Sequence, residues 1–191
     1  MKLVDHIVQF FKLVATGEVG TYNEFSLQHE FGTYLRSNMP LQFKVQFERP
    51  IGFFGHKPLP FIRKEIDIAL FSPEKGYKLA VELKFPRNGQ YPEQMFKACQ
   101  DIAFLEQHVD GGFKCSALVI AVDDPLFFSG DGKTELYRCF RTGQPVHGVI
   151  QKPTGAKDQA VAISGTHTIR WLQCGAEMKF SSVCLGSDAD I

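Results

Sequence analysis

The chain carries no excess of charge of either sign, because 21 lysines and arginines balance 21 aspartates and glutamates. Proteins that bind nucleic acid through their overall charge are strongly basic, with the positive residues gathered on one face. The sequence therefore excludes that class of binding protein. Any contact with nucleic acid has to come from a local group of residues.

The chain also lacks the cysteine spacing of a disulfide framework or a zinc site. Its five cysteines are scattered, and no two of them form a Cys-x-x-Cys pair. An odd number of dispersed cysteines is typical of reduced thiols in the cytoplasm. We therefore expect a cytoplasmic protein without structural disulfides.

No long hydrophobic run is present either. The apolar residues near the start are interrupted by Asp5, His6, Gln9 and Lys12, which argues against a signal peptide or a membrane span, so we expect no membrane partner. Common catalytic motifs are missing as well, including Gly-x-Ser-x-Gly, His-Glu-x-x-His and the dinucleotide fingerprint. The stretch from Gly130 to Thr134 is not a phosphate loop, because Phe127 stands where the first glycine is required.

What the sequence does contain is material for one good core. Its 191 residues are 44% hydrophobic and include 18 phenylalanines, which favours a single folded domain over residues 1–191. Apolar periodicity predicts helices over 3–15, from Thr21 to about Arg36, and over 91–109. Thr21 and Glu24 have the spacing of a capping box. Alternating or continuous apolar runs predict strands over 42–48, 62–70, 78–85 and 115–122. Residues 126–142 are expected to be partly helical, and short pieces such as 161–163 and 168–171 to be extra strands.

The stretch from Phe61 to Pro86 is the most informative. Apolar residues alternate with charged ones on both sides of a turn-like segment, Ser72 to Gly76, which predicts a β-hairpin. If the turn is centred between residues 74 and 75, paired residue numbers sum to 149. Asp67 then lies opposite Glu82.

Two carboxylates in that position repel each other, because directly opposed side chains are only about 5 Å apart. A divalent cation such as Mg²⁺, which prefers hard oxygen ligands, would offset the repulsion. A solvated charged face, with Lys84 and Glu65 compensating, is the alternative. The small neighbours Ala69 and Ala80 leave room for a ligand and favour the cation.

The segments Glu65-Ile66-Asp67-Ile68 and Val81-Glu82-Leu83-Lys84 resemble the motif of the PD-(D/E)XK nuclease superfamily, which has the restriction-endonuclease-like fold. Ile66 stands where the motif has its proline. The resemblance implies an α/β mixed sheet flanked by helices, with an αβββαβ core over about residues 21–122. Residues of about 123–186 would then be a C-terminal elaboration containing extra strands.

The same resemblance implies a catalytic site. Asp67, Glu82 and Lys84 would be the motif residues, and a helical glutamate would complete the metal site. Glu30, at the edge of the apolar stripe of its helix, matches that position, with Glu24 as the second choice. The expected cofactor is Mg²⁺, with Mn²⁺ as a substitute.

The expected activity is metal-dependent hydrolysis of phosphodiester bonds in nucleic acid, with DNA as the expected substrate. Gln94 and Lys97, on one polar edge of the long helix, and Arg87 just before it are candidates for substrate contacts. For the helical pair, a plain solvent-facing edge is the favoured explanation. Two alternatives stay open: an inactive binding or regulatory module with the same fold, and an interaction protein whose charged hairpin is merely solvated. Protein partners or a homodimer also stay open.

Overall fold

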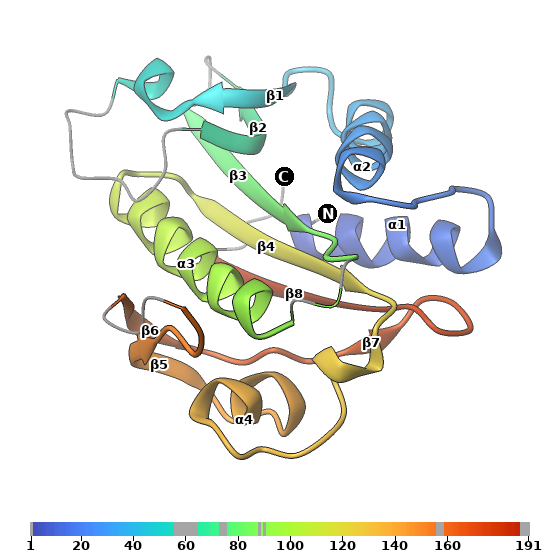
Figure 1. The fold of residues 1–191 in the computed structure, drawn as a ribbon. Helices are drawn as coiled ribbons and strands as arrows, with labels where there is room; N and C mark the ends of the chain where they lie inside the picture. The colour runs from blue at the N-terminus through green and yellow to red at the C-terminus, as the bar shows by residue number, and fades with distance from the viewer. Residues whose placement is uncertain are drawn as a thin grey trace.

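The computed structural model describes residues 2–55, 65–72, 76–87, 89, 91–155 and 159–187. Figure 1 shows a mixed β-sheet with helices on both faces. The helices are α1 (Leu3–Thr16), α2 (Glu24–Asn38), α3 (Tyr91–Asp110) and α4 (Glu135–Arg141), with short 3₁₀ turns at Ile51–Phe54 and Pro125–Phe127. The strands are β1 (Lys44–Pro50), β2 (Glu65–Ser72), β3 (Tyr77–Lys84), β4 (Cys115–Val122), β5 (Val146–Gln151), β6 (Ala160–His167), β7 (Leu172–Gln173) and β8 (Lys179–Gly186).

The central sheet has the strand order β1-β2-β3-β4-β8-β7. Strands β3 and β4 run parallel, joined by α3, and the other neighbouring pairs are antiparallel. The elements from α2 to β4 follow one another in the predicted order, helix, three strands, helix, strand. The structure thus confirms a mixed sheet with flanking helices. The predicted hairpin register is also confirmed, because Ala69 pairs with Ala80 and Ile68 with Val81.

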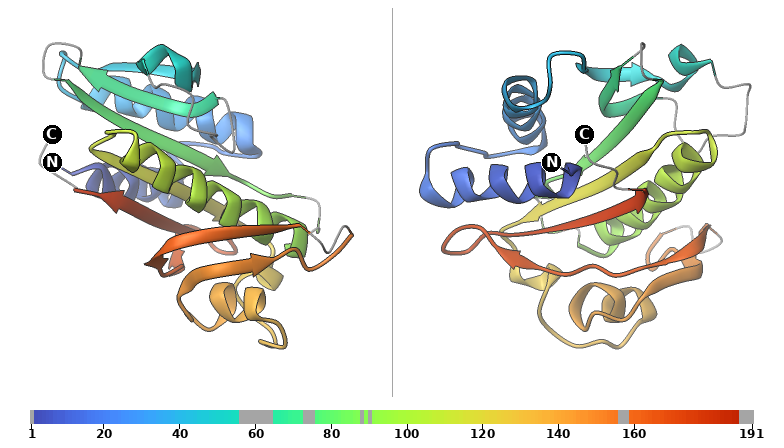
Figure 2. Two further views of the ribbon diagram at one scale, coloured as in Figure 1. Left: turned by 90° about the vertical axis from the view of Figure 1, so that its left-hand side faces the viewer. Right: turned by 180° about the vertical axis from the view of Figure 1, so that it is seen from behind.

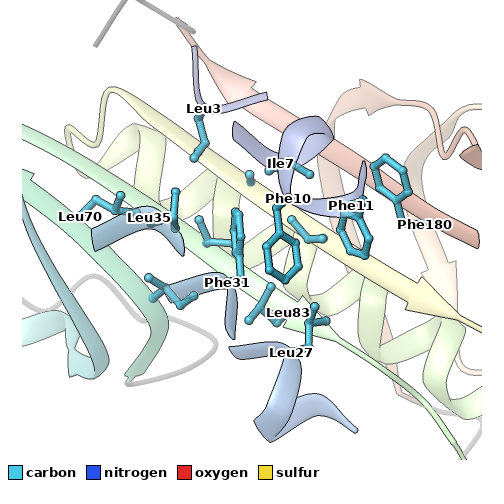
Figure 3. Packing of buried hydrophobic residues seen from close by; sticks show 14 of the residues in the cluster. Leu3, Ile7, Phe10, Phe11, Leu27, Phe31, Leu35, Leu70, Leu83 and Phe180 are labelled. Carbon is cyan, nitrogen blue, oxygen red and sulfur yellow. The ribbon is translucent and has the colours of Figure 1, made fainter. Parts of the chain in front are cut away.

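One face of the sheet is covered by α1 and α2. Leu3, Ile7, Phe10 and Phe11 from α1 meet Leu27, Phe31 and Leu35 from α2 over the inward residues of the sheet (Figure 3). Leu83 on β3 belongs to this cluster, so its neighbours Glu82 and Lys84 project from the opposite face. The period-2 alternation of β3 therefore assigns its apolar residues to one layer and its charged residues to the other.

The opposite face is covered by α3, and the hairpin β5–β6 and α4 lie beside that helix. They pack with α3 in one hydrophobic cluster (Figure 2). Near the middle of the sheet, Ala69 and Ala80 leave space that Phe104 from α3 and Phe113 fill. Among the described residues, no helix is both long enough and apolar enough to cross a membrane.

Two local predictions are corrected. Helix α2 is capped by Asn23 and not by Thr21. The Asn23 side chain accepts a hydrogen bond from the Ser26 N–H, and the Asn23 N–H donates to the Ser26 hydroxyl, so these two residues form the capping box. Residues 168–171 form no strand and instead connect β6 to β7. Strand β8 pairs along its whole length with β4 inside the central sheet. The start of the predicted second strand, 62–64, lies outside the described residues.

Helix α2 approaches β1 closely at a position without a side chain. A Cβ atom at Gly32 would overlap the ring of Phe47. The absence of that atom lets α2 lie against the strand, and Arg36 covers the other side of the same ring. This close approach helps to fix the helix that brings Glu24 to the end of β3.

Candidate active site

The candidate site lies where β2 and β3 stop pairing. Their register ends at Ile68 and Val81, so Asp67 and Glu82 are the first residues beyond it. The Asp67 N–H donates to Glu82 Oε1 at 3.4 Å, and the Leu83 N–H donates to Asp67 Oδ2 at 2.7 Å. Side chains thus replace the backbone ladder at this point. The two motif acids meet in the opening between the strands.

A third acid arrives from the other side of the sheet. Glu24 is the first residue of α2, and its Oε2 accepts a hydrogen bond from the Phe85 N–H at 3.1 Å. Its Oε1 lies 3.9 Å from Lys84 Nζ. The end of β3 is therefore held from α2 through Glu24. Because the site is at the end of the strands, helices covering opposite faces of the sheet can both reach it.

Lys84 is buried beside a buried acid on α3. Its Nζ is 3.3 Å from Asp101 Oδ2 and donates to the Leu83 carbonyl oxygen at 3.0 Å. Asp101 is 0% exposed, and Glu82 is equally buried. A charged carboxylate at that depth requires a nearby positive charge. Asp101 therefore holds the lysine ammonium at the end of β3.

Asp67 has an unusual proton affinity. Burial raises the pKa of its carboxyl to about 6, against the opposing effects of the Leu83 N–H and the Lys84 charge. The charges of Asp101 and Glu24 raise this pKa further. A carboxylate whose charge is disfavoured in the folded protein is stabilised by any cation that binds next to it. This shift is the kind found at functional sites.

A pocket of about 240 Å³ opens onto Asp67, lined by Glu24, Phe25, Gln28, Glu48, Asp67 and Leu83. Gln28 Nε2 bridges the pocket, donating to the Asp67 carbonyl oxygen at 2.9 Å and to Glu48 Oε1. Glu48 has φ +48°, which is the left-handed region, although it lies inside β1. Such a conformation is costly for a residue with a side chain and tends to be kept at functional positions.

The structure brings Glu24, and not Glu30, to this group. Glu30 Oε1 lies 3.2 Å from His29 Nδ1 on the outer part of α2. It follows Gln28 by two residues, a turn of about 200° around a helix, so it projects away from the side that faces Asp67. Glu24, the second choice for the helical acid, is therefore the glutamate of α2 that lies beside Lys84 and lines the Asp67 pocket. The predicted capping box began the helix at Thr21 and so placed Glu24 inside its first turn. In the structure, Glu24 is the first residue of α2.

The predicted substrate contacts lie around the same end of the sheet. Gln94 is seven residues before Asp101, so it shares that face of α3, about 10 Å nearer the helix start. Lys97 lines a separate pocket with Pro92, Glu93 and Thr154. Arg87 pairs with Asp123 and covers the Phe85 ring. Nothing in these contacts tests a role in substrate binding.

Sequence patterns had indicated neither Asp101 as the partner of Lys84 nor Glu48 and Gln28 as parts of the pocket. Asp101 lies on what reads as a polar, solvent-facing edge of a helix. Glu48 is an ordinary outward position in an alternating strand. Only the packing of α3 against β3, and of α2 against β1, reveals them.

The acidic side chains at this site offer hard oxygen donors, the kind that Mg²⁺ prefers. Within the part of the chain that the structure describes, no three histidine, cysteine, aspartate or glutamate side chains are arranged to hold a metal ion. Proteins usually bind Mg²⁺ through one or two carboxylates, with water and substrate phosphate completing the shell. The hard oxygens of Asp67 and Glu82, with Glu24 nearby, fit that chemistry. A cation beside Asp67 would stabilise the ionised form of a carboxyl whose pKa is raised by burial.

A second acid on α3, the partly buried Glu106, provides a contrast. Glu106 accepts hydrogen bonds from the Ser164 N–H at 2.8 Å, the Gly165 N–H at 2.7 Å and His167 Nε2 at 2.8 Å. Burial alone would raise its pKa, but these donors outweigh that effect and lower the pKa. This carboxylate joins α3 to β6. It is a stable anion in a closed set of donors.

Comparisons with known proteins returned no match: the chain matches no model of a protein family, no curated protein and no solved structure.

Proposed function

We propose that this chain is a metal-dependent nuclease that hydrolyses phosphodiester bonds, with DNA as its substrate. The observation that carries the proposal is the meeting of Asp67, Glu82 and Lys84 at the point where β2 and β3 separate. The element order from α2 to β4 and the resemblance of the motif to the PD-(D/E)XK superfamily support it. The restriction-endonuclease-like fold is part of the same proposal.

Each residue has a role that follows from its surroundings. Asp67 and Glu82, with Glu24 from α2, would hold Mg²⁺ or Mn²⁺. A bound divalent cation supplies Lewis-acid stabilisation of negative charge on the phosphate oxygens. Lys84 Nζ, fixed by Asp101 and the Leu83 carbonyl, adds a positive charge that is already oriented before substrate arrives. Asp101 is a positioning residue that acts through Lys84.

The direct test is incubation with supercoiled plasmid, linear duplex and single-stranded DNA, in Mg²⁺, Mn²⁺ or EDTA. We expect cleavage with either metal, none in EDTA, and none with Asp67→Asn. That substitution keeps an oxygen to accept the Leu83 N–H. Glu106→Gln is the matched control, because it also neutralises a partly buried acid that accepts a backbone N–H. Equal cleavage by the wild type and Asp67→Asn would refute the proposal.

A binding module without catalysis is distinguished by a second measurement. We expect Mg²⁺ to raise the melting temperature of the wild type but not that of Asp67→Asn. A metal-dependent rise without cleavage of any DNA would favour a cation-dependent binding module. No rise and no cleavage would favour the interaction protein with a solvated charged face.

A further inference from the structure

A phenylalanine ring stands exposed at the mouth of the acid pocket. Phe25 is 80% exposed, although it lines the same pocket as Asp67 and Glu24. The core residues of α2 are Leu27, Phe31 and Leu35, so Phe25 is not needed for packing. Tyr22, just before the helix, is 71% exposed, with its backbone N–H fixed to Ser26 Oγ. Two aromatic rings thus flank Glu24 in solvent.

The charge of the pocket makes these rings informative. Among the described residues, its lining includes Glu24, Glu48 and Asp67 but no lysine or arginine. Electrostatic attraction of a nucleic acid depends on basic residues that displace counterions from the phosphates. Apart from Lys84 beside Glu24 and the proposed cation, the described residues of this site offer little such attraction, so a contact that does not depend on charge would add to substrate binding. Stacking of a base on an aromatic ring is such a contact, and it tolerates any base.

We propose that Phe25 is a stacking platform for an unpaired nucleobase, so that the preferred substrate is single-stranded nucleic acid or an unpaired end. This inference rests on the proposed function for the position of the reacting phosphate. A base can offer its face to a protein ring only when it has left the stack of a duplex. The neighbouring phosphate would then lie near Asp67 on β2, beside the end of β3.

The experiment measures binding separately from cleavage. The probes are a fluorescein-labelled dT12 strand and its duplex with dA12, and binding is followed by fluorescence anisotropy in Mg²⁺. The parent protein carries Asp67→Asn, and Phe25→Ala, Phe25→Leu and Phe25→Trp are each made in that parent. Leu41→Ala is the matched control, since Leu41 is fully exposed but follows the far end of α2. Phe25→Leu keeps apolar bulk and removes only the aromatic face.

We expect Phe25→Ala and Phe25→Leu to weaken single-strand binding by roughly 5- to 150-fold, the range found for loss of one stacked base. Phe25→Trp and Leu41→Ala should bind as the parent does. The dependence of affinity on salt should not change, because no charge is removed. A 2-aminopurine base in the strand should be quenched by the parent and not by Phe25→Leu.

Unchanged single-strand affinity in Phe25→Leu would overturn the proposal, as would an equal loss of duplex affinity or no binding of the parent to dT12. The outcome of the cleavage test with the wild type is independent of the outcome of this binding test. If Phe25→Leu weakens binding but the wild type cleaves nothing, the platform stands and the nuclease assignment falls. If the wild type cleaves duplex and single strand equally and Phe25→Leu has no effect, the nuclease stands and the platform falls.

Discussion

Asp67 and Glu106 are two acids of one protein that the fold treats in opposite ways. Glu106 sits among three hydrogen-bond donors between α3 and β6, and its pKa is lowered. Asp67 sits at the separated ends of β2 and β3, close to other acids, and burial raises its pKa to about 6. The first carboxylate is satisfied by the chain itself. The second would be stabilised by a bound cation, as the proposed metal site requires.

The largest expected effect comes from Lys84. Lys84→Met should reduce cleavage more than ~100-fold, as loss of a preorganised charge does. It should also cost about 3–5 kcal/mol of unfolding free energy, because Asp101 is left buried without its cation. The double variant Lys84→Met/Asp101→Asn should recover most of that stability and none of the activity. Urea unfolding and a cleavage assay measure the two effects. Recovery of cleavage in the double variant would remove Lys84 from the mechanism.

The pH dependence of stability should differ in sign between the two acids. The pKa of Asp67 is raised from 3.8 to about 6, so its ionised form costs the folded state up to about 3 kcal/mol above pH 6 and nothing below pH 4. Asp67→Asn should therefore gain stability relative to the wild type as pH rises from 4 to 6. For the same reason, metal affinity of the wild type should rise across that range. Denaturant unfolding and metal titration at each pH provide the check.

Glu106→Gln should behave in the opposite way. The lowered pKa of Glu106 means that its stabilisation is present at neutral pH and disappears as pH falls through that pKa. We expect a loss of about 1–3 kcal/mol at pH 7, since an amide replaces one acceptor by a donor, and a smaller loss in acid. Cleavage and the Mg²⁺-induced thermal shift should stay at wild-type levels. A lost metal response would contradict the division into structural and functional acids.

Glu48 offers the smallest and cleanest comparison. Glu48→Ala and Glu48→Gly both remove the carboxylate and its contact with Gln28, but only glycine adopts φ +48° without strain. Glycine should therefore be more stable than alanine by about 1 kcal/mol in thermal or chemical unfolding. Equal stabilities would show that the left-handed conformation is not maintained in solution.

Much of the sheet could be predicted from the sequence because its signals are local. Period-2 alternation and a short turn predict the β2–β3 register, and a nearly continuous apolar run, seven of eight residues, marks β4. No local sequence signal predicted the pairing of β8 with β4, because the alternation within a short strand does not indicate which distant strand it pairs with. The same holds for Asp101, which reads as solvent-facing until α3 is placed on β3.

The site was predicted in part for the same reason. Asp67, Glu82 and Lys84 lie on two adjacent strands, so their spacing fixes their neighbourhood. Which helical glutamate reaches the site depends on where α2 begins and on the rotation of α2 about its axis. Glu30 follows Glu24 by six positions, so the two side chains lie at different places along the helix. Capping by Asn23 and the close approach at Gly32 determine that rotation. Neither is visible in the apolar periodicity on which the choice of Glu30 was based.

The pairing of β4 with β8 has a consequence for biosynthesis. Residues 115–122 pair with residues 179–186, so one edge of a largely apolar strand has no partner until more than fifty further residues leave the ribosome. Unpaired edges of this kind recruit other chains. We therefore expect a chain truncated before Lys179 to aggregate as it is synthesised, even though every residue of the proposed catalytic group has already been translated.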